Sequence, residues 1–181
     1  LTRSSAASDV YKRQVYQRIR YDATAPVNPI IGPAFDSERR AAPDLYLALP
    51  DGVNPMIREW AVQQPAEARQ FAEVFLQYVR ENPFYYTLKP PRYSGDDIDQ
   101  FLFSGRRGFC EHYASAMAFA ARAAGIPSRV VAGYQGGEWH PDGYLTVRQY
   151  DAHAWIELWD GEQWFRVDPT SAVAPDRIEY G

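Results

Sequence analysis

GFCEHYA, residues 108–114, is the stretch that decides the fold, because it opens a predicted helix and holds the single cysteine of the 181 residues. From Cys110 to Ala124, small apolar side chains recur at helical spacing. Gly125 and Pro127 follow them, which is typical of a helix end. We therefore expect other elements to pack closely around this helix.

Cys110 has two interpretations. One cysteine cannot form an internal disulfide, and a free cysteine is most often an inert, buried side chain. At the start of a helix, however, a thiol lies near the positive end of the helix dipole, which stabilises a thiolate. The preceding segment GRRG, residues 105–108, adds positive charge. This setting favours a nucleophile.

A hairpin after the helix supplies a candidate base for this thiol. Asp160-Gly161 separates two predicted strands, 152–159 and 163–167, and predicts a two-residue loop. In that register His153 lies opposite Asp168. Opposite residues have Cβ atoms about 4.5–5.5 Å apart, which allows a hydrogen bond from imidazole to carboxylate. A base oriented in this way activates a nucleophile, although a longer loop would shift the register.

The same side chains have structural interpretations. His153 could be a half-exposed strand histidine, and Asp168 could begin a turn. Asp96, Asp97 and Asp99 form a weak calcium pattern that helix capping explains better. No cysteine or histidine pair has the spacing of zinc ligands, so we expect neither a metal nor a cofactor.

Helical patterns precede strand patterns along the chain. Helices are expected from Asn54-Pro55, over 65–80 and over 97–103, and strands over 128–134, 143–149, 152–159 and 163–167. Helices followed by strands are typical of an α+β fold with an antiparallel sheet.

Composition indicates one folded domain. Hydrophobic residues make up 46% and aromatic residues 15% of the chain, which is enough for a core. We expect a disordered or non-native leader (1–14), an extended proline-rich arm (15–55) and the main domain (56–181). The net charge of −4 and the lack of a basic block argue against nucleic-acid binding. No apolar run approaches the ~20 residues of a membrane span.

Three motifs together resemble the transglutaminase-like superfamily. They are GFCEHYA at 108–114, YDAHAWIE at 150–157 and WFRVDPT at 164–170, linked by AGIPSRVV at 124–131 and GYQGGE at 133–138. The whole is similar to the bacterial membrane-anchored members, from about residue 46 to 178. This resemblance implies a papain-like α+β fold whose cysteine helix packs on an antiparallel sheet.

The resemblance also implies roles. Cys110 would be the nucleophile, His153 the general base and acid, and Asp168 its orienter. The thiolate would attack a glutamine carboxamide of a protein or peptide, and the acyl group would pass to an amine or to water. One oxyanion donor would be the Cys110 N–H, and Tyr93 or Trp155 are weak candidates for the second or for substrate contact.

Other expectations follow from the same resemblance. The domain would face the periplasm or cell exterior, in a full-length protein anchored to the inner membrane by segments outside this chain. Two other functions stay open. A cysteine peptidase or amidase acting on envelope peptides would use the same three residues, and an envelope interaction module would keep only the fold.

Overall fold

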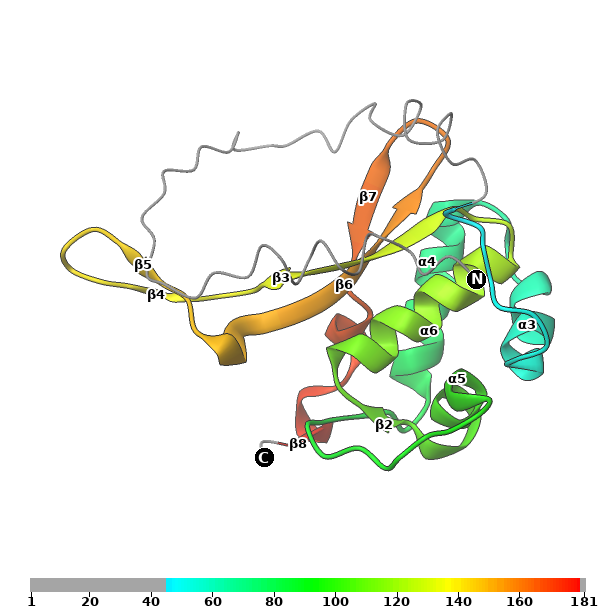
Figure 1. The fold of residues 1–181 in the computed structure, drawn as a ribbon, viewed down its shortest axis with the longest axis horizontal. Coiled ribbons are helices and arrows are strands. Elements are labelled where there is room, and N and C mark those ends of the chain that lie inside the picture. Colours follow the sequence, from blue (N-terminus) through cyan, green and yellow to red (C-terminus); the bar gives the residue numbers. More distant parts are fainter. Residues whose placement is uncertain (1–44, 180–181) are drawn as a thin grey trace, which may run out of the picture.

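The computed structural model describes residues 45–179. The expected leader (1–14) and the first thirty residues of the expected arm (15–44) therefore lie outside the described residues. Within the described part, the helices gather on one side and the longer strands extend from them on the other (Figure 1). Helix α6 (Cys110–Ala123) runs between these two groups.

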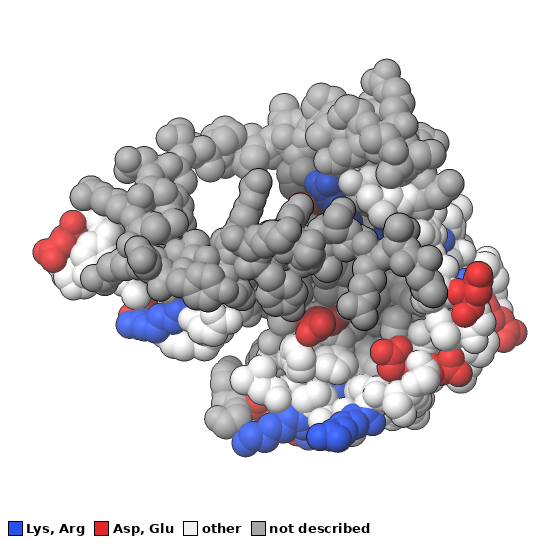
Figure 2. All heavy atoms as spheres, viewed as in Figure 1, with Lys and Arg blue, Asp and Glu red and all other residues white. Residues whose placement is uncertain are grey.

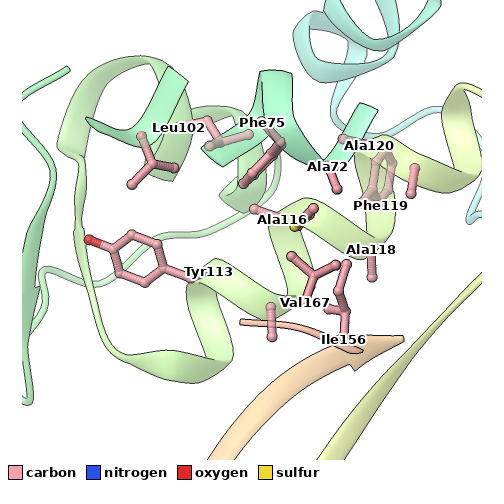
Figure 3. Packing of buried hydrophobic residues seen from close by; sticks show 14 of the residues in the cluster. Ala72, Phe75, Leu102, Tyr113, Ala116, Ala118, Phe119, Ala120, Ile156 and Val167 are labelled. Carbon is pink, nitrogen blue, oxygen red and sulfur yellow. The ribbon is translucent and has the colours of Figure 1, made fainter. Parts of the chain in front are cut away.

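Helix α6 is the centre of the core. Nine of its fourteen residues are buried and five of those nine are alanines, so neighbouring elements approach it closely from several sides. Helices α3 (Pro55–Val62) and α4 (Ala68–Glu81) pack on it, as do strands β3 (Ser128–Tyr134) and β6 (Ala152–Trp159). Figure 3 shows Phe75 and Ile156 approaching it from opposite sides. The expected close packing is confirmed.

The starts of helices α3 and α4 are set by a proline and by a capping side chain, respectively. Pro55 occupies the first position of α3, as predicted. Helix α4 begins at Ala68, three residues later than predicted. The reason is a local cap, because the Glu67 carboxylate accepts the backbone N–H groups of Arg69 and Gln70 at 2.9 and 2.8 Å.

The expected helix over 97–103 is a short α-helix followed by a π-helix. Helix α5 (Asp97–Asp99) continues into the π-helical segment η1 (Gln100–Gly105). Asp99 is buried and caps α3 rather than its own helix, since its carboxylate accepts the N–H groups of Met56 and Ile57, each at 2.8 Å. This carboxylate thus caps a helix, although the helix is α3 and not its own.

The larger sheet has the order β3-β6-β7 and is antiparallel throughout, with β7 at Trp164–Val167. A smaller parallel sheet joins three distant segments, β1 (Tyr85–Thr87), β2 (Arg107–Gly108) and β8 (Ile178–Glu179), in the order β2-β1-β8. The expected strand over 143–149 is shorter. It is β5 (Leu145–Thr146), which pairs with β4 (Glu138–Trp139) in a hairpin that projects from the domain (Figure 1).

The predicted register of the β6–β7 hairpin is wrong by two residues. Trp159 pairs with Trp164, so the loop has four residues rather than two. The cause is the Asp160 side chain, whose Oδ1 accepts the N–H groups of Glu162 and Gln163 at 3.0 and 2.9 Å and holds a longer turn. A shift of two residues keeps every side chain on its predicted face, whereas a shift of one would have reversed them.

Short 3₁₀ segments complete the described chain. They are η2 (Gln149–Asp151) before β6, η3 (Pro169–Ala172) after β7, and η4 (Pro175–Arg177) before β8. Segment η3 packs on both α4 and α6, which brings the end of β7 towards the cysteine helix. The α+β class, with the cysteine helix packed on an antiparallel sheet, is confirmed.

The last residues of the expected arm lie against the sheet side of the domain. The Ser128 N–H donates to the Tyr46 carbonyl at 3.1 Å, and the Tyr46 ring meets the Trp164 ring edge-on at 5.1 Å. Both signs of charge are dispersed over the described surface in the view of Figure 2. Within residues 45–179, no helix combines the length and the apolar character needed to cross a membrane.

Candidate active site

Cys110 is the first residue of α6, as predicted. Phe109 before it is extended, with φ −114° and ψ −177°, so the helix begins abruptly at the cysteine. The first N–H groups of a helix have no helical acceptor, which leaves the Cys110 N–H available to another partner. Gly108 allows this tight entry, because an added Cβ there would lie 2.7 Å from the His112 Cβ. Cys110 is only 9% exposed.

His153 and Asp168 meet in a short hydrogen bond. His153 Nε2 lies 2.6 Å from Asp168 Oδ2, and the two side chains are 13% and 15% exposed. The predicted contact is therefore present, although not as a cross-strand pair. Strand β7 ends at Val167, and Asp168 reaches His153 from the turn that follows. With Nε2 bonded to the carboxylate, Nδ1 is the ring nitrogen left for another partner.

The second oxygen of Asp168 is held by the next turn. Oδ1 accepts the Thr170 hydroxyl at 2.6 Å and the Thr170 backbone N–H at 3.1 Å. No role of its own was predicted for Thr170 from the sequence. Two donors from one residue on the same oxygen fix the direction of the carboxylate.

Tyr86 on β1 contacts the cysteine, a role that is not predicted from the sequence. The pKa of its phenol is raised above 10.0, first by burial and next by the charge and side chain of Cys110, whereas the Cys110 backbone N–H, which donates to the phenol oxygen, lowers it. The Asp168 charge raises the pKa further. The phenol therefore contacts Cys110, and the Asp168 charge also acts on it. Its strand pairs with Gly108 through a contact distant in sequence, so no local pattern indicates it.

Tyr93 and Trp155, the two weak candidates for substrate contact, lie in different places. The Tyr93 hydroxyl donates to the Arg107 carbonyl at 2.9 Å, and burial is the main reason that its pKa is raised. Tyr93 lines a cavity of about 380 Å³ with Glu111 and His112. Because successive residues of an α-helix are rotated by about 100°, Glu111 and His112 lie on a different face of α6 from Cys110. A role for Tyr93 at the thiol stays a prediction.

Trp155 lies beside the His153–Asp168 pair. Its ring stacks with the His153 ring at 6.4 Å between centroids and 24° between planes. Gly133 on the paired strand makes room for the indole, because an added Cβ there would lie 2.7 Å from it. The Arg166 guanidinium lies 4.2 Å from the Trp155 ring centroid. The geometry thus places Trp155 as a wall of the site next to the histidine.

His112 is the other histidine near the cysteine. Burial lowers its pKa against the opposing charges of Glu111 and Asp97, so it is neutral near pH 7. Its Nδ1 faces the Phe109 N–H at 3.5 Å. Among the residues that the structure describes, no group of three or more histidine, cysteine, aspartate or glutamate side chains is arranged to hold a metal ion.

The geometry and the motifs agree with a known family. Residues 58–169 match the transglutaminase-like superfamily. Because the match spans more than half of the chain, the chain belongs to this superfamily, as its motifs predict.

Two relatives and one crystal structure are particularly similar. The chain is 56% identical over 140 residues to the protein-glutamine gamma-glutamyltransferase of Pseudomonas aeruginosa, covering 75% of this chain and 21% of that protein. It is 32% identical over 147 residues to the uncharacterized protein YebA of Bacillus subtilis, covering 75% and 20%. The periplasmic domain of TgpA from P. aeruginosa, solved bound to ethylmercury, matches with a TM-score of 0.69 at 52% identity, covering 73% and 49%. The chain thus spans about a fifth of the curated relatives it matches.

Proposed function

We propose that this domain catalyses acyl transfer from a glutamine carboxamide of a protein or peptide to an amine, or to water, through a thioester on Cys110. The observation that carries the proposal is the 2.6 Å hydrogen bond between His153 and Asp168. It lies on the sheet against which the cysteine helix packs, and Tyr86 contacts Cys110 while the Asp168 charge acts on its phenol. The family and the transferase relative support the reaction class.

The hydrogen-bonded pair of His153 and Asp168 accounts for the proton transfers of the reaction. Asp168 accepts the Nε2–H of His153 and so leaves the Nδ1 lone pair to take the thiol proton. The Cys110 sulfur then attacks the carboxamide carbon, and the carbonyl electrons move to its oxygen. His153 returns the proton to the nitrogen as the C–N bond breaks, and ammonia leaves. An amine, deprotonated by His153, attacks the thioester and regenerates the thiol.

The start of α6 supplies the charge stabilisation. The Cys110 N–H has no acceptor within the helix, and it is one donor to the developing oxyanion in place of the Tyr86 oxygen that accepts it in the structure. Tyr86 is the second donor, because its hydroxyl adjoins the same N–H and its raised pKa keeps it protonated. We propose Tyr86 for this role ahead of Tyr93, because the Tyr93 hydroxyl donates to the Arg107 carbonyl.

We also propose a cellular location for this domain. The domain works on the periplasmic side of the inner membrane, within a longer, membrane-anchored protein, on glutamine-bearing envelope proteins or peptides. The solved relative is a periplasmic domain, and the chain covers only 21% of the transferase relative, which supports this assignment.

An amine-incorporation assay tests the function. The protein is incubated with a glutamine-rich acceptor protein and a fluorescent primary amine, with the Cys110→Ala variant as control. Covalent incorporation by the wild type that disappears in Cys110→Ala is the expected result. Cleavage of peptide bonds without incorporation would replace the transferase with a cysteine peptidase. If neither occurs and Cys110 does not react with iodoacetamide near neutral pH, an interaction module is the better description.

A further inference from the structure

The carboxylate of Asp168 has two oxygens with different partners. Oδ1 is held twice by Thr170, through the hydroxyl at 2.6 Å and the backbone N–H at 3.1 Å. Oδ2 is the oxygen that accepts from His153 at 2.6 Å. The orientation of the carboxylate about its own bond is therefore set from the Thr170 side.

A cationic side chain competes with His153 for the same carboxylate oxygen. The Arg166 Nη2 lies 3.8 Å from the same Oδ2. Arg166 is held near by two other contacts, since it donates to Gln135 Oε1 at 2.9 Å and lies over the Trp155 ring at 4.2 Å. Its guanidinium could bind a carboxylate with two parallel hydrogen bonds, which is the geometry that arginine favours. A small rotation of the Asp168 carboxylate would suffice to approach it.

We propose that Thr170 is a positioning residue of the site, whose hydroxyl holds Asp168 so that its carboxylate faces His153 rather than Arg166. The hydroxyl contact is the shorter of the two Thr170 bonds and fixes the carboxylate plane. Without it, Oδ1 keeps only the 3.1 Å backbone bond, and the charged Arg166 draws the carboxylate away from the imidazole. Outer groups that orient a reacting side chain commonly change activity about 10- to 100-fold.

The competing explanation is a purely structural one, in which Thr170 merely stabilises the turn. Asp168 does cap η3, and the Ser171 hydroxyl also bonds to the Asp168 backbone carbonyl at 2.6 Å. Ser171 is thus a matched control, because its hydroxyl serves the same turn without touching the carboxylate. The inference rests on the proposed acyl transfer, so its test needs one measurement that does not depend on that reaction.

The first experiment compares Thr170→Val, Thr170→Ser and Ser171→Ala in amine incorporation. Thr170→Val removes the hydroxyl at nearly constant shape and should lower kcat about 10-fold or more with KM within about twofold. Thr170→Ser keeps the hydroxyl and should restore most of the rate. Ser171→Ala should stay within about twofold of the wild type. Adding Arg166→Gln to Thr170→Val should recover part of the lost rate, because the competing cation is gone.

The second experiment observes the hydrogen bond itself by ¹H NMR, without substrate. The proton between His153 and Asp168 should resonate downfield of the amides in the wild type, in Thr170→Ser and in Ser171→Ala, and be lost or shifted upfield in Thr170→Val. This result would support the positioning role even if the wild type incorporated no amine. A Thr170→Val variant with wild-type kcat or an unchanged resonance would overturn it, as would an equal loss of rate with and without Arg166→Gln.

Discussion

Tyr86 shows how one residue can matter through a contact that local sequence does not reveal. Its phenol adjoins the cysteine that begins α6 and feels the charge of Asp168. Its ring also stacks on Tyr113 at 6.4 Å and 17°. The side chain is therefore held in place while its hydroxyl faces the thiol. This is the arrangement expected of a group that acts on a reacting atom without forming a covalent bond to it.

Replacing Tyr86 with phenylalanine should separate this chemical role from packing. Losing one oxyanion donor typically lowers kcat about 100-fold, so Tyr86→Phe should do so with little change in Tm. Because the pKa of Tyr86 is raised above 10.0, the wild type should keep this donor up to at least pH 10. Steady-state amine incorporation measures the rate, and differential scanning fluorimetry measures Tm.

Tyr85→Phe is the matched control for this change. Its side chain follows the other face of the same strand, where the Arg107 guanidinium lies 5.3 Å from the ring. The Tyr85→Phe variant should keep the wild-type kcat. Equal rates for Tyr86→Phe and the wild type would remove Tyr86 from the oxyanion site.

At the scale of elements, α3 and α5 hold each other by reciprocal caps. The Asp99 carboxylate accepts the first N–H groups of α3, and the Asn54 side-chain oxygen accepts the N–H groups of Ile98 and Asp99 at 3.1 and 3.2 Å. The two helices both pack on α6, and the chain from α5 leads through η1 to the cysteine. A fault in these caps would therefore loosen the segment that positions Cys110.

Removing the buried carboxylate tests this pair of helices. Asp99→Ala leaves two backbone N–H groups of α3 without their acceptor, and we expect the free energy of unfolding to fall by about 2–3 kcal/mol. Urea denaturation followed by circular dichroism measures the change. Asp97→Ala is the control, because that carboxylate accepts only its neighbour's N–H at 2.8 Å, and its loss should cost less than about 1 kcal/mol. Equal effects of the two substitutions would show that the cap on α3 contributes little.

At the scale of the whole molecule, tyrosines around the start of α6 make the folded state less stable at alkaline pH. Burial is the first cause of the raised pKa of Tyr113, Tyr86 and Tyr93. Tyr113 is fully buried, and its hydroxyl donates to the Tyr85 carbonyl at 2.9 Å. In Figure 3 that hydroxyl points away from the α6–β6 contact towards the far end of the core. The folded state thus holds these protons more tightly than the unfolded chain does.

The sign of the effect follows from this difference. Above the ordinary tyrosine pKa of 10.0 the unfolded chain loses these protons first, so the free energy of unfolding should fall as pH rises past 10. The fall due to fully buried Tyr113 is about 1.4 kcal/mol per pH unit until its own raised pKa is reached. Urea titrations at pH 8 and pH 11 measure it. Tyr113→Phe should be slightly less stable at pH 8 and show a shallower fall, and an unchanged slope would contradict this account.

Local patterns in the sequence determined much of the fold. The sequence predicted β3 and β6 with the bounds that the structure has, and α6 to within one residue of its end. The alternation of apolar and polar residues in strands, the helical spacing of apolar residues and the glycine at the end of α6 each involve only neighbouring residues. These signals can therefore be recognised without the rest of the chain. The same patterns predicted that His153 and Asp168 meet.

Only the tertiary structure decided how the site is assembled. The Asp160 side chain lengthened the hairpin loop, and Asp168 reached His153 from the turn after β7 because the two-residue shift preserved its face. Tyr86 joined the site through a parallel strand pair with Gly108, and Asp99 capped a helix more than forty residues away. The physical reason is that these contacts join segments distant along the chain. Their geometry depends on the packing of whole elements around α6, which no short stretch of sequence encodes.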